Sequence, residues 1–291
     1  MRPVLIPVYA SRYFTATALL LALCWPCGIA DDASARQEEA GRCYKQAKRL
    51  WQPDSENGTK AMILIDKAIK LSPETAEYYS QKAEFLLQTE EDDGGALTLI
   101  DRALAKQPNN PHYHTVRAET LARLNRLPEA KEAINKAMGK DADANCYMWQ
   151  IKSNILHRLG DDKGAEDAIT QSVRQKPNNQ DFRQVRAKLR YSQNNFAGAI
   201  EDTSMIINDR QHSSSTAVVL DAYLIRARAY ARSKKNDLAK QDYLLLHELA
   251  PDVRTALAEA KQFFQSIGHK KNEDLFSRRI KSLDGDYVMP K

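Results

Sequence analysis

The stretch CWPC at residues 24–27 holds two cysteines at the spacing of a redox dithiol or of half a zinc site. A redox pair needs a helix N-terminus or a nearby positive charge that lowers the pKa of one thiol, and it usually lies in a βαβ unit. Here the pair instead ends an apolar run over residues 14–23. We therefore expect no thiol chemistry from these cysteines.

The sequence contains no other complete catalytic or metal-binding motif. His247-Glu248 begins the zinc-protease pattern H-E-x-x-H, but Pro251 stands in the place of the second histidine. His112 and His114 lie two residues apart, and side chains at that spacing on a helix point away from each other. Glycine-rich phosphate-binding patterns and the G-x-S-x-G of serine hydrolases do not occur. The sequence thus predicts a protein that is not an enzyme, with no metal site and no cofactor.

Residues 1–30 are typical of a secretory signal peptide. Arg2 and Arg12 are the only charged residues before Asp31, an apolar core follows Arg12, and small residues precede the expected cut after Ala30. This core is shorter than the roughly 20 apolar residues of a membrane-spanning helix. The sequence therefore predicts an exported protein, which is periplasmic, secreted or on the cell surface. The alternatives are an uncleaved membrane anchor and a mitochondrial transit peptide.

The composition argues against a nucleic-acid partner. The chain has 43 lysines and arginines against 38 aspartates and glutamates, and removal of the leader arginines would bring it closer to neutral. A nucleic-acid-binding protein would show a basic patch or stripe. Without the leader only Cys43 and Cys146 remain, which is too few for a disulfide scaffold, so stability must come from packing.

Small or apolar residues recur in three columns, which indicates an internal repeat. Six units begin near residues 40, 76, 111, 146, 180 and 220, and a weaker seventh begins near 254. Alanine in such columns lets two helix axes approach closely, while apolar residues at i, i+3 and i+4 face the next unit. Each unit is therefore expected to be a pair of helices that needs its neighbours to bury its apolar face. The columns are Ala47, Ala83, Ala118, Ser153, Ala187 and Ala227; Ala61, Ala96, Ala130, Ala165, Ala199 and Ala239; and Ala68, Ala103, Ala137, Ser172, Ile206 and Leu246.

These units resemble the tetratricopeptide repeat family. The shared features are a proline that closes the second helix, an aromatic residue early in the first helix, and the turn RLGDDKGA at residues 158–165. The prolines are Pro73, Pro108, Pro177 and Pro251, and the aromatic residues are Tyr79, Trp149 and Tyr223. Unit five departs from the motif, because Arg183 and Arg190 occupy the early aromatic and late apolar positions, and an excess of six residues around 211–215 would act as a joint. The resemblance implies an all-α, right-handed superhelical solenoid of about six helical hairpins with capping helices at the C-terminus.

The expected domains follow from these boundaries. They are a signal peptide at 1–30, a lead-in at 31–39, six repeats over 40–253, a degenerate seventh unit or capping helices at 254–283, and a flexible tail at 284–291.

The resemblance also implies a binding face, since in this family the concave face is lined by the first helix of each hairpin and usually binds an extended peptide or a partner helix. Helical spacing places eight candidates there: Tyr147, Gln150, Asn154, Arg158, Lys188, Tyr191, Arg228 and Arg232. The amide side chains can bond a peptide backbone, and the basic residues predict an acidic segment or a C-terminal carboxylate as the ligand.

The sequence therefore predicts a non-enzymatic protein-interaction scaffold of an exported compartment that binds a peptide or helix in this groove. The alternative is a membrane-tethered assembly subunit of a multiprotein machine, which would bind through its convex face or loops. The membrane would be a partner only if the leader stays uncleaved. The oligomeric state is left open.

Overall fold

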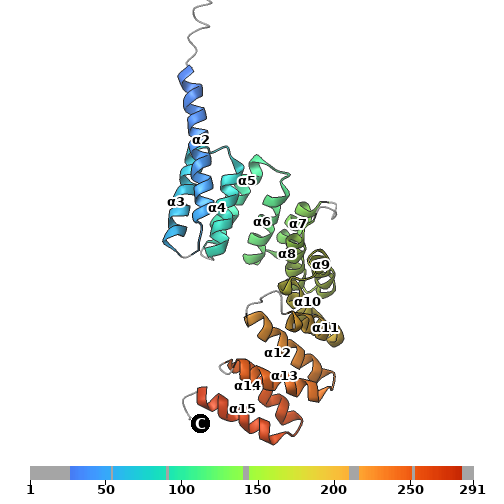
Figure 1. Cartoon of the computed structure of the whole chain (residues 1–291). Coiled ribbons are helices and arrows are strands. Elements are labelled where there is room, and N and C mark those ends of the chain that lie inside the picture. The colour runs from blue at the N-terminus through green and yellow to red at the C-terminus, as the bar shows by residue number, and fades with distance from the viewer. Residues whose placement is uncertain are drawn as a thin grey trace, which may run out of the picture. The chain divides into compact units, whose positions relative to one another are not determined.

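The computed structural model describes residues 27–53, 55–89, 92–139, 144–209, 216–250 and 253–283. All regular structure in these ranges is α-helical, and most helices pack against the next one along the chain (Figure 1). The predicted all-α arrangement of paired helices is confirmed. The helices are α2 (Cys27–Leu50), α3 (Glu56–Leu71), α4 (Ala76–Thr89), α5 (Asp93–Lys106), α6 (Pro111–Arg123), α7 (Leu127–Met138), α8 (Cys146–Arg158), α9 (Asp162–Gln175), α10 (Gln180–Ser192), α11 (Phe196–Asn208), α12 (Thr216–Arg232), α13 (Asn236–Leu249), α14 (Arg254–Ser266) and α15 (Lys270–Leu283).

Most of the predicted signal peptide, the joint at 211–215 and the tail at 284–291 lie outside the described residues. The first described helix, α2, begins at Cys27 and continues through the predicted lead-in. Cleavage after Ala30 would leave α2 from Asp31 onward in the mature chain. No helix in the described ranges is both long enough and apolar enough to cross a membrane.

The three columns of small and apolar residues lie where helices pack against each other. Every member of the first two columns has no exposed surface, from Ala47 to Ala227 and from Ala61 to Ala239. In the third column the largest exposed fraction is 6%, at Ala137. Small side chains at these positions let the two helices of each hairpin approach closely.

Five of the helices end in the same left-handed turn. Backbone φ is positive at Asn125, Gly160, Asn194, Lys234 and Gly268. The next N–H then bonds the carbonyl five residues back, as in Arg126 to Leu121 and Lys235 to Tyr230, both at 2.9 Å. This Schellman geometry favours glycine or asparagine, so a lysine at position 234 is strained.

Several second helices of the hairpins begin with an N-cap side chain that accepts a hydrogen bond from the backbone N–H of a glycine. Asp92 and Asp161 accept hydrogen bonds from the N–H groups of Gly95 and Gly164, at 2.7 and 2.9 Å. A Cβ atom at Gly95 would lie 2.0 Å from the Asp92 carboxylate, so only glycine allows this cap to close.

The chain divides into two compact units between Val116 and Arg117, and each has its own core. In the first unit, α2 packs on α3, α3 on α4, and α4 on α5. Its core includes Tyr44 of α2 and Tyr78 and Phe85 of α4, and Trp51 stacks on Phe85 with ring centroids 3.9 Å apart.

In the second unit the helices pack in chain order from α7 to α15, and α10 also contacts α12. Its C-terminal core joins α13, α14 and α15, where Phe263, Phe264 and Phe276 lie against Tyr243 and Leu246. The hairpin of α14 and α15 thus covers the apolar face of the preceding hairpin.

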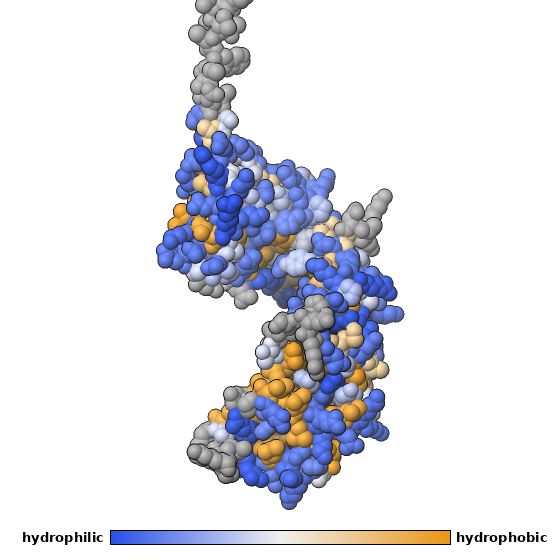
Figure 2. Space-filling model, in the orientation of Figure 1, coloured by the Kyte–Doolittle hydropathy of each residue, from blue (hydrophilic) through white to orange (hydrophobic). Residues whose placement is uncertain are grey.

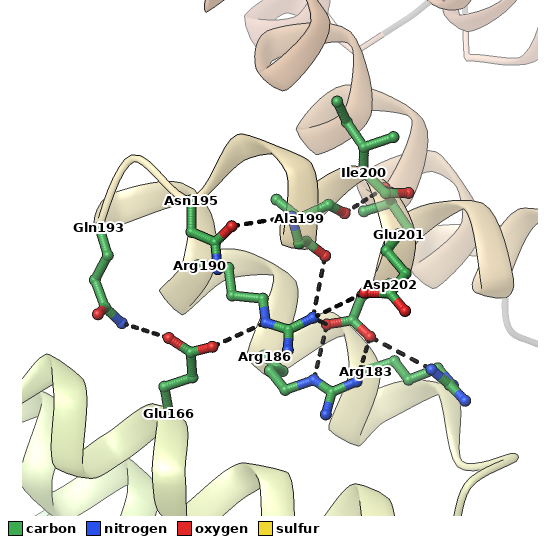
Figure 3. A network of polar contacts seen from close by, with 12 residues as sticks. Glu166, Arg183, Arg186, Arg190, Gln193, Asn195, Ala199, Ile200, Glu201 and Asp202 are labelled. Carbon is green, nitrogen blue, oxygen red and sulfur yellow. Dashed lines mark hydrogen bonds and ion pairs between the residues drawn. The ribbon is translucent and has the colours of Figure 1, made fainter. Parts of the chain in front are cut away.

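Within this second unit, the hairpin of α10 and α11 replaces part of its apolar packing with a buried ion network (Figure 3). Asp202 of α11 has no exposed surface and accepts two hydrogen bonds from Arg186, at 2.8 and 2.6 Å. Arg190 and Arg183 also reach the Asp202 carboxylate, at 2.9 and 3.4 Å. Arg190 extends to Glu166 of α9 at 2.9 Å, which links this hairpin to the preceding one. The two arginines that break the repeat motif are thus partners of one buried carboxylate.

Candidate functional site

A cavity of about 530 Å³ opens on the face formed by α6, α8 and α10 in the second unit. These are the first helices of three successive hairpins, so the cavity lies on the face that the sequence predicted to bind. It brings together five of the eight predicted residues: Tyr147, Gln150, Asn154, Arg158 and Lys188.

The floor of this cavity is apolar. Ala122 of α6, Ile151 of α8 and Leu189 of α10 line it and are each less than a tenth exposed. Val185 is partly exposed beside them. Such a floor can hold an apolar side chain of a ligand.

Gln150 and Asn154 stand above this floor on α8. They lie four residues apart, so both amides are on the same face of the helix. Gln150 is half-buried and Asn154 is exposed, and neither side chain has a hydrogen-bond partner among the described residues. Each amide offers one acceptor oxygen and two N–H donors. The pair can therefore bond both the N–H and the C=O groups of a peptide backbone.

Tyr147 and Arg158 mark the two ends of the α8 segment that lines the cavity. The Tyr147 hydroxyl donates to Glu119 of α6 at 2.6 Å, and the residue as a whole remains 47% exposed. Arg158 donates to the carbonyl of Ala122 at 2.5 Å and to the side chain of Asn125 at 3.0 Å. Arg158 is thus engaged in holding the C-terminal end of α6 and is not a free ligand for a partner.

Lys188 lies on the α10 side of the cavity and is paired. Its ammonium nitrogen is 2.5 Å from Asp221 of α12, and the Gln184 side chain donates to the same carboxylate at 2.7 Å. The Lys188 side chain is 53% exposed and that of Asp221 is 32% exposed. The charge of Lys188 is therefore largely balanced before any ligand arrives.

The other three predicted residues do not line this cavity. Tyr191 packs on the ring of Phe196 with centroids 5.6 Å apart, and Arg232 lies over the same ring at 5.9 Å. Arg228 forms a two-pronged ion pair with Glu259, and these hydrogen bonds raise the pKa of its guanidinium. The basic end of the predicted groove is thus built mainly of paired or stacked cations.

The apolar floor was not predicted from the sequence, although the spacing of its residues could have indicated it. Ile151 is four residues after Tyr147, and Leu189 directly follows Lys188. Helical spacing places such residues partly on the binding face as well as in the core. The eight residues predicted for that face did not include Ile151 or Leu189.

The histidines that the sequence singled out point to different partners. His112 is 2.8 Å from the Glu84 carboxylate, whereas His114 is 2.8 Å from the carbonyl of Pro108. Across the described ranges, no group of three or more histidine, cysteine, aspartate or glutamate side chains could hold a metal ion. Cys43 and Cys146 are buried and free.

The sequence pattern of the tetratricopeptide repeat matches residues 94–145. The chain is a protein of tetratricopeptide-repeat fold. No curated protein matches this chain in sequence.

Solved structures share the fold at low sequence identity. PilF of Pseudomonas aeruginosa has a TM-score of 0.61 at 16% identity, with 82% of this chain and 99% of that chain covered. PilW, described as a type IV pilus biogenesis factor, has a TM-score of 0.64 at 16% identity, with 73% and 94% covered. YrrB, described as a tetratricopeptide-repeat protein with an unusual peptide-binding site, has a TM-score of 0.55 at 20% identity, with 68% and 97% covered. At this identity the likeness extends to the fold alone.

Proposed function

We propose that this chain is a protein-interaction scaffold that binds an extended peptide segment of a partner in the cavity of α6, α8 and α10. The observation that carries the proposal is the pair of amides, Gln150 and Asn154, which have no hydrogen-bond partner among the described residues and line the same cavity as the apolar floor. A peptide needs both kinds of contact, because its backbone has to be hydrogen-bonded once it leaves water.

Each part of the cavity has a role in this proposal. Gln150 and Asn154 hold the backbone of the segment, which makes recognition tolerant of its sequence. An apolar side chain of the segment lies on Ile151 and Leu189. The exposed ring of Tyr147 adds contact area at a small cost in side-chain entropy.

The paired charges around the cavity best suit a segment that is uncharged or carries charges of both signs. An acidic ligand or a C-terminal carboxylate, which the sequence predicted, would have to compete with Asp221 for Lys188 and with Glu259 for Arg228. Since exposed charges are screened within about 8 Å at physiological salt, such a competition would gain little affinity.

We further propose that the scaffold works in an exported compartment, as the leader composition predicts. The tethered alternative requires that residues 1–30 stay attached to the chain. Sequencing the N-terminus of the native protein separates the two. A mature terminus at Asp31 supports export with cleavage, as does one just after Ala35, since Ala33-Ser34-Ala35 is a second pattern of small residues typical of a cleavage site. An intact Arg2 in the membrane fraction supports the tether.

The peptide proposal is tested by panning short random peptides displayed on phage against the full chain. Synthetic copies of the enriched peptides are then titrated into wild-type protein and into the double variant Gln150→Ala, Asn154→Ala. The double variant should bind about tenfold to a hundredfold more weakly, since each lost hydrogen bond contributes about 0.5 to 1.5 kcal/mol.

The matched control is Gln171→Ala with Gln241→Ala, which removes two amides from the second helices α9 and α13. This control should bind like the wild type. Equal affinity of both double variants for every enriched peptide would overturn the proposal.

A further inference from the structure

A second apolar cavity, of about 480 Å³, lies one hairpin further along the second unit. It is lined by the N-terminal part of α12, the C-terminal end of α13 and the start of α14, with Gln184 of α10 at its edge. Figure 2 shows apolar side chains gathered over α12 to α14 on the face in view. Val253, which lines this second cavity, is 41% exposed.

One wall of the second cavity is built by a turn that the preceding three first helices lack. The first helices α6, α8 and α10 each have 13 residues, but α12 has 17. The small column aligns Ala227 of α12 with Ala187 of α10, so the additional turn is residues 216–219. Ala217 and Val218 of this turn line the cavity. The additional turn of α12 thus builds part of the pocket.

The two cavities meet at a polar ridge. Lys188 lines the first cavity, Asp221 lines the second, and their side chains are 2.5 Å apart. Gln184 also bonds Asp221 and lines the second cavity. The ridge of Gln184, Lys188 and Asp221 is therefore the shared boundary, and a chain leaving the first cavity past Lys188 meets the second one directly.

We propose that the second cavity binds a second apolar side chain of the same peptide segment. This proposal rests on the proposed function and names its ligand more closely. The first anchor lies on Ile151 of α8 and Leu189 of α10, whereas the second cavity lies between α12 and α14. The two are therefore about two helix spacings apart, which at 8 to 10 Å per spacing is about 16 to 20 Å. An extended peptide advances about 3.3 Å per residue. The ligand is thus an extended segment with two apolar anchors about five or six residues apart and small or polar residues between them, which cross the ridge.

The test compares the peptides that panning enriches on four versions of the full chain. The wild type should select two apolar positions about five or six residues apart. Val218→Asp places a charge in the second cavity, and Ala217→Trp fills it from an exposed position that tolerates a larger side chain. Both should select peptides with the first anchor only. The control Leu238→Asp changes an apolar residue of α13 that is 41% exposed and lines neither cavity, and it should select as the wild type does.

Binding affinities measured with synthetic peptides test the second anchor quantitatively. Replacing the second anchor of a synthetic peptide by serine should weaken binding to the wild type about tenfold or more, because burial of a whole aliphatic side chain is lost. The same replacement should change nothing in Val218→Asp and Ala217→Trp, whose helicity is checked by circular dichroism.

The outcomes separate the two proposals. Enriched peptides that depend on Gln150 and Asn154 but show no second anchor would overturn the second cavity and leave the proposed function standing. Peptides that ignore Gln150 and Asn154 altogether would overturn the proposed function, and this inference with it.

Discussion

Arg186 and Asp202 form a two-pronged ion pair in which the carboxylate is completely buried. The next hairpin repeats the arrangement, where Arg226 donates to Asp242 through two bonds of 2.8 Å. In both hairpins the arginine lies on the first helix and the aspartate on the second. The two ion pairs thus join the two helices of each of these hairpins, in addition to the packing of their alanine columns.

Asp202→Ala should lower the free energy of unfolding by about 3 to 5 kcal/mol, because it leaves Arg186 buried without its counter-charge. Urea denaturation followed by circular dichroism measures the change. The control is Glu201→Ala, whose side chain is 72% exposed and which should change stability by less than about 0.5 kcal/mol. A loss no larger than that of the control would show that the network adds nothing to stability.

Lys234→Gly should raise the free energy of unfolding by about 1 kcal/mol. The lysine has φ of 59° in the turn between α12 and α13, where a Cβ atom is strained and glycine is not. The neighbouring Lys235 has φ of −88°, so Lys235→Gly gains no such relief and should be neutral or destabilising. The melting temperature should therefore rise for Lys234→Gly and stay the same or fall for Lys235→Gly. A lower melting temperature for Lys234→Gly would contradict the strain argument.

Stability should depend on the ionisation of His247. Its Nε2 is buried without a partner in the described part of the chain, and its ring meets Phe276 edge-on at 5.3 Å. Burial, followed by the charge of Arg279, lowers the pKa of His247 below its usual 6.5, against the smaller opposing effect of Glu248. The unfolded chain then binds the proton more readily. The His247 contribution is therefore present above about pH 6.5 and is lost as the pH falls below it.

His247→Leu should remove this loss, as measured by urea denaturation across pH 5 to 8. His112 should change stability with pH in the opposite direction, because its hydrogen bond with Glu84 raises its pKa. The His112 contribution is present below about pH 6.5 and fades as the pH rises through the raised pKa. A His247→Leu profile that still declines below pH 6.5 as steeply as the wild type would contradict the assignment.

The hairpins could be predicted because their determinants are local and periodic. The alanine columns and the turn of residues 158–165 depend only on spacing, and the structure buries or caps these positions as expected. The positions of Tyr147, Gln150 and Asn154 on one face of α8 follow from the same spacing.

The charge pairs could not be read from spacing. Lys188 and Arg228 were taken as available cations, but each meets a carboxylate on a later first helix, Asp221 or Glu259. Such contacts depend on the reach of long side chains between neighbouring hairpins. Arg183 and Arg190 likewise appear in the sequence only as departures from the motif, whereas in the structure both bind the carboxylate of Asp202.

The central claim is that a peptide lies on the floor of the cavity between α6, α8 and α10. Methyl NMR of the full chain with labelled isoleucines tests it most directly, during titration with a synthetic peptide enriched by panning. The account predicts a large, saturable shift of the Ile151 methyl and little change at Ile63, which is 64% exposed on α3 and lies far from the cavity in sequence. A saturable shift at Ile63 with Ile151 unmoved would contradict the account, because the peptide would then bind a surface outside this cavity.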